Sequence, residues 1–146
     1  MEIGAAEYRK ASEEHLSGAI HCHLNGDYLT CHYLCGLAVE CILLAYRWKI
    51  DSSWNGRHAL PKLYKEARFD GLVRDKESSD MAVKFLAITS RRSNTHRYTS
   101  PAKLEKFLNE RGATRNLKRN KLKANASEML SAADFIVKIG INKWNN

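Results

Sequence analysis

The run from Tyr28 to Trp48 is the most apolar part of the chain, and it constrains the fold more than any other segment. It is long enough to cross a bilayer as a helix, but it carries His32, Glu40 and Arg47, and charged side chains within a span are costly. Because it is apolar nearly all round, we expect a buried central helix, about Tyr28 to Lys49, with no membrane contact. We expect the 146 residues to form a single domain, 1–146.

Helical periodicity continues on the N-terminal side of this run. A first helix, about Gly4 to Leu24, carries one apolar stripe: Leu16, Ala19, Ile20 and Leu24. The sequence Asn-Gly-Asp at 25–27 ends it, and Asp27 is the expected N-cap of the central helix. A loop this short makes the two helices antiparallel neighbours.

Further helical segments follow, and no alternating run of strand type is bounded by turn residues. The third helix is expected at about Ala59 to Phe69, and a fourth helix begins after an N-cap at Ser79 or Asp80. The next helix runs from Ser100-Pro101 to Gly112, and the last from about Ala113 to Ile139. Their expected core contacts are Leu60, Leu63, Tyr64 and Ala67; Met81, Phe85, Leu86 and Ile88 or Thr89; Leu104, Phe107 and Leu108; and Leu117, Met129, Ala133, Ile136 and Ile139. The fold class is therefore all-α, an up-and-down bundle of four to five helices.

The net charge of +8 is carried by one part of the chain. Residues 91–123 hold 11 Lys or Arg and 2 acidic residues, whereas the remainder holds 13 basic and 14 acidic residues. Such a segment suits a polyanion, RNA or DNA; the alternative is a solvated helix face. The candidate RNA-binding residues are Arg97, Arg111, Arg115, Lys118, Arg119 and Lys121.

Cysteine and histidine residues gather around the hairpin of the first two helices: His21, Cys22, His23, Cys31, His32 and Cys35. The short loop spacing between ligands that is typical of zinc sites is missing. We therefore interpret the cysteines as core residues and expect neither a metal nor another cofactor. Together with Cys41 they sit on helices in the first third of the chain, which is unlike a disulfide framework and fits the reducing cytoplasm.

Glu40 stands alone in the middle of the apolar helix. A buried carboxylate without a partner is costly, so we expect a partner, either His58 or an arginine from residues 91–98. Such a contact could be an ordinary structural hydrogen bond or could serve chemistry directly.

The sequence RRSNTHRY, residues 91–98, contains no aliphatic residue although it follows an apolar helix. On a straight helix two pairs share a face, Arg92 with His96 and Asn94 with Tyr98; Arg91 and His96 converge only if the helix begins, ends or bends there. An arginine beside a histidine suits phosphodiester chemistry, because His can move a ribose 2′-hydroxyl proton and Arg can hold the charge developing on phosphate. The alternative is a basic helix end that only binds phosphate.

These motifs together resemble the HEPN domain family, over roughly residues 5 to 140. The helix GDYLTCHYLCGLAVECILLAY, the following GRHALPKLYKEA and the arginine–histidine–tyrosine motif are similar to the family's successive motifs. The family signature is an arginine, four to six residues, then a histidine, which Arg91 and His96 satisfy. Arg91, His96 and Tyr98 also fit the Arg-x4-His-x-Tyr pattern of the toxin branch of HEPN/MNT toxin–antitoxin pairs.

The resemblance implies a helical bundle that forms a homodimer, with the motifs of two protomers in one cleft. It implies a metal-independent endoribonuclease that leaves 2′,3′-cyclic phosphate ends, a cytoplasmic toxin or defence component. His96 would be the general acid or base, Arg91, with Arg92 as the geometric alternate, would stabilise the phosphate, and Asn94 would orient the histidine or phosphate. Tyr98 would position the site, and in toxin-like members it is the residue that an antitoxin nucleotidyltransferase modifies.

Two other hypotheses stand beside the ribonuclease. A HEPN bundle without catalysis would bind RNA or a nucleotide, or dock on a nucleotidyltransferase, through the basic residues named above. A purely structural dimer would use the apolar helix as its interface and would leave the polarity of residues 91–98 unexplained.

Overall fold

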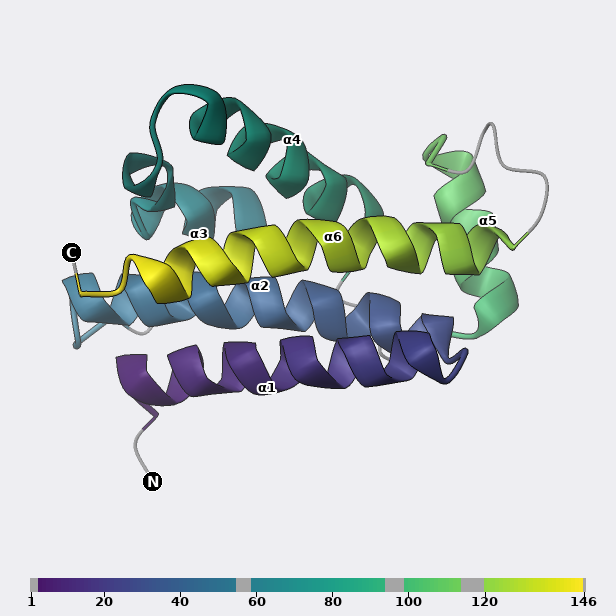
Figure 1. The fold of residues 1–146 in the computed structure, drawn as a ribbon, viewed down its shortest axis with the longest axis horizontal. Coiled ribbons are helices and arrows are strands. Elements are labelled where there is room, and N and C mark those ends of the chain that lie inside the picture. Colours follow the sequence, from purple (N-terminus) through teal and green to yellow (C-terminus); the bar gives the residue numbers. More distant parts are fainter. Residues whose placement is uncertain (1–2, 55–58, 94–98, 114–119, 146) are drawn as a thin grey trace.

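The regular structure of this protein is helical throughout the part of the chain that the computed structural model describes, residues 3–54, 59–93, 99–113 and 120–145 (Figure 1). Three long helices, α1 (Ala5–Leu24), α2 (Tyr28–Ile50) and α6 (Lys121–Asn142), pack against one another. The expectation of an all-α fold is confirmed, but the described residues form six α-helices instead of the expected four to five.

Shorter elements complete the bundle, α3 (Leu60–Glu66) and α4 (Asp75–Arg91) along one side of these three helices and α5 (Pro101–Glu110) at one end of them (Figure 1). Helix α3 contacts α2 and is followed by a single 3-10 turn, η1 (Phe69–Leu72). Helix α4 packs principally on α6, and α5 contacts α6 near the start of that helix (Figure 1).

Helix α2 is the central helix, as its composition predicts. Its fully buried side chains include Cys31, Cys35, Val39, Ile42 and Leu43. It is long and apolar enough to cross a membrane, but more than half of its most apolar window is buried inside the bundle, as in a core helix. The Oδ1 atom of Asp27 accepts the Thr30 N–H at 3.1 Å, so the expected N-cap is confirmed.

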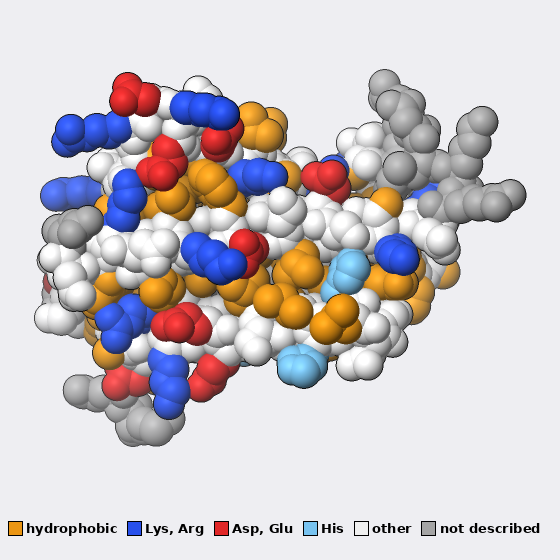
Figure 2. Space-filling view, in the orientation of Figure 1, with side chains coloured by type: hydrophobic (Ala, Val, Ile, Leu, Met, Phe, Trp, Pro, Cys, Tyr) orange, Lys and Arg blue, Asp and Glu red, His pale blue; other side chains and the backbone are white. Residues whose placement is uncertain are grey.

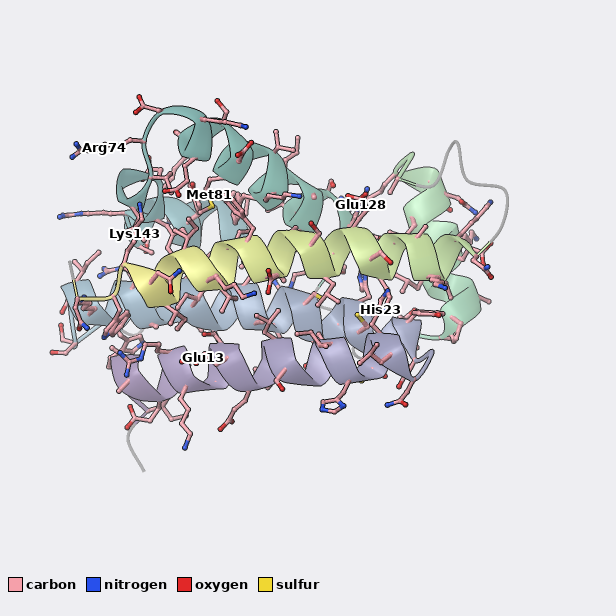
Figure 3. All side chains as sticks on the ribbon, viewed as in Figure 1. Glu13, His23, Arg74, Met81, Glu128 and Lys143 are labelled. Atoms are coloured by element: carbon pink, nitrogen blue, oxygen red, sulfur yellow. The ribbon has the colours of Figure 1, made fainter. Side chains whose placement is uncertain are left out.

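The C-terminal end of α6 and the residues directly after it contact four other elements, α1, α2, η1 and α4. The Tyr46 hydroxyl donates to the Gly140 carbonyl at 2.6 Å. The Nζ atom of Lys143 reaches the Leu72 carbonyl at 2.6 Å and Glu77 Oε1 at 2.8 Å, beside the start of α4 (Figure 3). The Trp144 ring lies between the cations of Arg9 and Lys49, at 5.0 and 4.4 Å from its centroid.

Several expected helix boundaries are wrong, each at an unusual backbone residue. The third helix ends at Glu66 instead of Phe69, before Arg68 takes a left-handed conformation with φ of 54°. Helix α4 begins at Asp75, several residues before Ser79 or Asp80. Helix α6 begins at Lys121 instead of Ala113, directly after Asn120 with φ of 49°.

Some expected core contacts are wrong as well. Leu86 is 65% exposed, and the α4 residues that are buried are Met81 and Ile88. In α1 the stripe is buried at Leu16 and Ala19, whereas Ile20 and Leu24 are exposed. The remaining expected contacts within the described residues are buried or half-buried, and Leu117 lies outside those residues.

Candidate functional site

The candidate site begins where α4 ends. Arg91 is the last residue of the helix, and Arg92 has an extended backbone, with φ of −95° and ψ of 143°. The Arg92 N–H still donates to the Ile88 carbonyl, at 3.0 Å. Positive side chains at this end are favoured by the partial negative charge of the helix C-terminus. Because the helix ends at Arg91, the argument that Arg92 and His96 share a straight-helix face does not apply.

Arg92 supplies the partner that Glu40 was expected to have. Its Nη2 atom donates to Glu40 Oε2 at 2.6 Å, and the two side chains are 16% and 33% exposed. Of the two proposed partners an arginine of the motif is therefore the one observed, while His58 lies outside the described residues. Glu40 is half-buried instead of fully enclosed.

Gly36 makes this contact possible, and the sequence analysis missed it. A Cβ atom at Gly36 would lie 2.7 Å from Arg92 Cδ and Nε, so the arginine side chain occupies the volume of the absent methyl group. The signal was in the sequence: a glycine lies within an apolar helix, four residues before Glu40 and therefore on the same helix face as Glu40.

Arg91 differs from its neighbour. Its side chain is half-buried at the helix end, and within the described part of the chain it forms no recorded hydrogen bond or ion pair. Of the two adjacent arginines, one is therefore engaged with α2, and the other has no polar partner among the described residues. The partners expected for Arg91 in the motif, Asn94, His96 and Tyr98, lie outside the described residues together with Arg97.

Cys41 lies within electrostatic reach of the Glu40–Arg92 pair. Burial, and after it the nearby Glu40 carboxylate, raise the pKa of the Cys41 thiol to about 12, and Arg92 opposes the shift. The thiol is thus protonated at neutral pH and is not a nucleophile there.

The two described candidates for RNA binding, Arg111 and Lys121, lie just after α5 and at the start of α6. Ser100 caps α5 by accepting the Lys103 N–H at 3.3 Å, as expected for the Ser-Pro start. Arg111, exposed after the helix, lies over the Phe107 ring at 4.4 Å from its centroid, and Lys121 at the start of α6 bonds Asn109 at 3.4 Å. Four of the expected RNA-binding residues lie outside the described part of the chain: Arg97, Arg115, Lys118 and Arg119.

Basic residues are not concentrated over the face drawn in Figure 2. There the described Lys and Arg side chains are interspersed with Asp and Glu side chains.

The histidines and cysteines around the first hairpin form separate contacts. His32 bonds Asn125 at 2.8 Å in the core, and His23 on α1 bonds Ser127 on α6 at 2.8 Å (Figure 3). The buried Cys31 and Cys35 are free cysteines that share a side-chain hydrogen bond, which together with burial raises the pKa of Cys35 well above its usual range. Among the described residues no group of three or more such side chains is arranged to hold a metal ion.

Comparison with known proteins adds no relative. No family model, no curated protein and no solved structure matches this chain. The function must therefore be argued from the residues and their geometry.

Proposed function

We propose that this protein is a metal-independent endoribonuclease of the HEPN type, a toxin or defence component of the cytoplasm. The observation that carries the proposal is the end of α4, where Arg92 is engaged with Glu40 and the adjacent Arg91 is not. The spacing of the family motif assigns the phosphate-binding role to Arg91, and this is the arginine that has no polar partner among the described residues. The all-α architecture with a long apolar central helix supports the same family assignment.

In the proposed reaction the ribose 2′-oxygen attacks the adjacent phosphorus, and the bond from phosphorus to the 5′-oxygen breaks. One His96 accepts the proton of the 2′-hydroxyl, and a second, protonated His96 gives a proton to the leaving 5′-oxygen. Two histidines require two protomers, which is why the proposal includes a homodimer with one composite site. Arg91 stabilises the charge that develops on the phosphate, Asn94 orients the histidine or the phosphate, and Tyr98 positions the site.

The test is cleavage of total RNA by the purified protein in the presence of a chelator. We expect cleavage with 2′,3′-cyclic phosphate ends, and His96→Ala is expected to lower the rate by about 10²- to 10⁴-fold, the usual contribution of general acid–base catalysis. Arg91→Ala is expected to lower it as well, and the wild type is expected to sediment as a dimer. Circular dichroism verifies that each variant is folded.

A wild type that cleaves RNA no better than folded His96→Ala would contradict the ribonuclease. If both proteins still bind RNA with the same salt dependence, the protein is instead a binding module, the alternative that the basic residues around α5 favour.

A further inference from the structure

We propose that Glu40 is a positioning residue, which through its ion pair with Arg92, in the space left by Gly36, fixes where the arginine–histidine motif begins against α2. The inference rests on the proposed ribonuclease function, because it assigns Glu40 a role in that site. Glu40 is not expected to touch the substrate.

The ion pair joins two elements that otherwise have little contact. Helix α4 packs principally on α6, yet the Arg92 side chain turns from the end of α4 toward α2. At 2.6 Å, with the arginine side chain largely buried, the contact is a charge-assisted hydrogen bond that defines one geometry.

Gly36 determines the path of that side chain. The absent Cβ atom would approach Arg92 Cδ and Nε to 2.7 Å and Cγ to 3.2 Å. Any other residue at position 36 would therefore push the arginine stem off α2. Gly36 and Glu40, one helical turn apart, together form the seat of Arg92.

The motif follows this seat directly along the chain. His96 is four residues after Arg92 in the sequence, and a chain spans at most about 3.3–3.6 Å per residue, so the position of Arg92 limits how far away the histidine can be. Fixing Arg92 on α2 thus limits where the catalytic histidine can be placed. It also withdraws Arg92 from the phosphate and leaves that role to Arg91.

A positioning role differs from a stabilising role in what a mutation changes. Partly exposed ion pairs contribute little to stability, and alanine is a better helix former than glycine. Gly36→Ala removes no charge and no hydrogen-bonding group from the protein. The substitution should therefore leave stability almost unchanged while it moves Arg92.

The experiment compares Gly36→Ala with Gly18→Ala, the same change in helix α1, where the new Cβ would meet only the Leu34 Cδ1 atom at 3.2 Å. For Gly36→Ala we expect kcat to fall by roughly 10- to 100-fold, the effect of displacing a catalytic group by about 1 Å, with KM and Tm nearly unchanged. Gly18→Ala is expected to match the wild type. The double variant Glu40→Arg/Arg92→Glu, which reverses the pair, is expected to recover more activity than either single change.

Amide hydrogen exchange provides a readout that needs no activity. The peptide that starts at Arg92 should exchange faster in Gly36→Ala and in Glu40→Gln than in the wild type and in Gly18→Ala. If the wild type cleaves RNA and Gly36→Ala cleaves equally well, the positioning role is overturned. If the wild type does not cleave RNA, the ribonuclease proposal fails alone: faster exchange in the two variants still supports the seat of Arg92, and equal exchange overturns it.

Discussion

Polar side chains of the apolar helix α2 have partners on other elements. His32 bonds Asn125 and Tyr46 bonds the Gly140 carbonyl, both on α6, and Glu40 bonds Arg92 after α4. Apolar contacts alone are non-directional, whereas each of these hydrogen bonds requires one position of α2 along its neighbour. We infer that these side chains set the register of the central helix.

Tyr46 makes the free energy of unfolding depend on pH in the alkaline range. Burial raises the pKa of its hydroxyl from 10.0 to about 12. A raised pKa contributes stability that is complete below the unfolded value and is lost as the pH rises through the folded value. Between about pH 10 and 12 this group should lower the free energy of unfolding by about 1.4 kcal/mol per pH unit.

Tyr46→Phe tests this dependence. The variant should be about 1 kcal/mol less stable at neutral pH, because the buried Gly140 carbonyl loses its donor. Its urea-unfolding free energy should then fall less steeply than that of the wild type above pH 10. Parallel curves for the two proteins would show that Tyr46 does not ionise on unfolding.

At the scale of the elements, α2 and α6 approach closely at Gly140. A Cβ atom there would lie 2.5 Å from Ile42 Cγ1 and 3.2 Å from the Phe69 ring, both fully buried. Gly140→Ala should therefore cost stability although alanine favours the helix.

We expect Gly140→Ala to lower the free energy of unfolding by about 1–2 kcal/mol, because the higher helix propensity of alanine offsets only part of the cost of overpacking. Chemical denaturation measures it, with Gly18→Ala as the control that is expected to change stability by less than about 0.5 kcal/mol. A Gly140→Ala variant as stable as this control would mean that the two helices can separate without cost.

Helix starts were predictable from the sequence where a single side chain determines them. Asp27 and Ser100 both cap as expected, because the capping bond is local. The start of α4 was missed because Arg74 at its N-cap has no capping side chain, although Asp75 and Glu77 fall in the first turn, where acidic residues are favoured. The start of α6 was missed because Asn120 adopts a left-handed conformation, which the neighbouring sequence does not predict.

The candidate site was predictable only in part, because local features can be predicted from the sequence and tertiary contacts cannot. The composition of α2 indicated that Glu40 needs a partner, but two candidates stood far from it in sequence. The choice of Arg92 depends on α4 ending at Arg91 and on the space at Gly36, and both are tertiary features. The exposure of Leu86 is likewise a tertiary feature. Only a narrow face of α4 packs along α6, and the periodicity of the sequence predicts a wider buried face than the one observed.

For the whole molecule, charge distribution is the property that bears on RNA binding. The triple variant Lys118→Gln, Arg119→Gln and Lys121→Gln should weaken RNA binding and reduce the slope of log K against log salt by up to about 2, at about 0.7 per lost phosphate contact on single strands. Filter binding or anisotropy over a salt series measures this.

The matched control removes three exposed lysines elsewhere: Lys10→Gln, Lys62→Gln and Lys138→Gln. Both variants lose the same net charge, so an equal effect on affinity would indicate attraction by total charge instead of a localised site. An unchanged slope in the first variant would identify its three residues as solvated surface.

The two ends of the chain lie at one end of the long helices, whereas α5 lies at the other (Figure 1). An affinity tag, fluorophore or fused domain at either terminus would therefore extend away from the α5 end. The protein can be immobilised through either terminus with its α5 end turned toward the solution. Single-molecule and surface-based RNA measurements thus require no choice between N-terminal and C-terminal attachment.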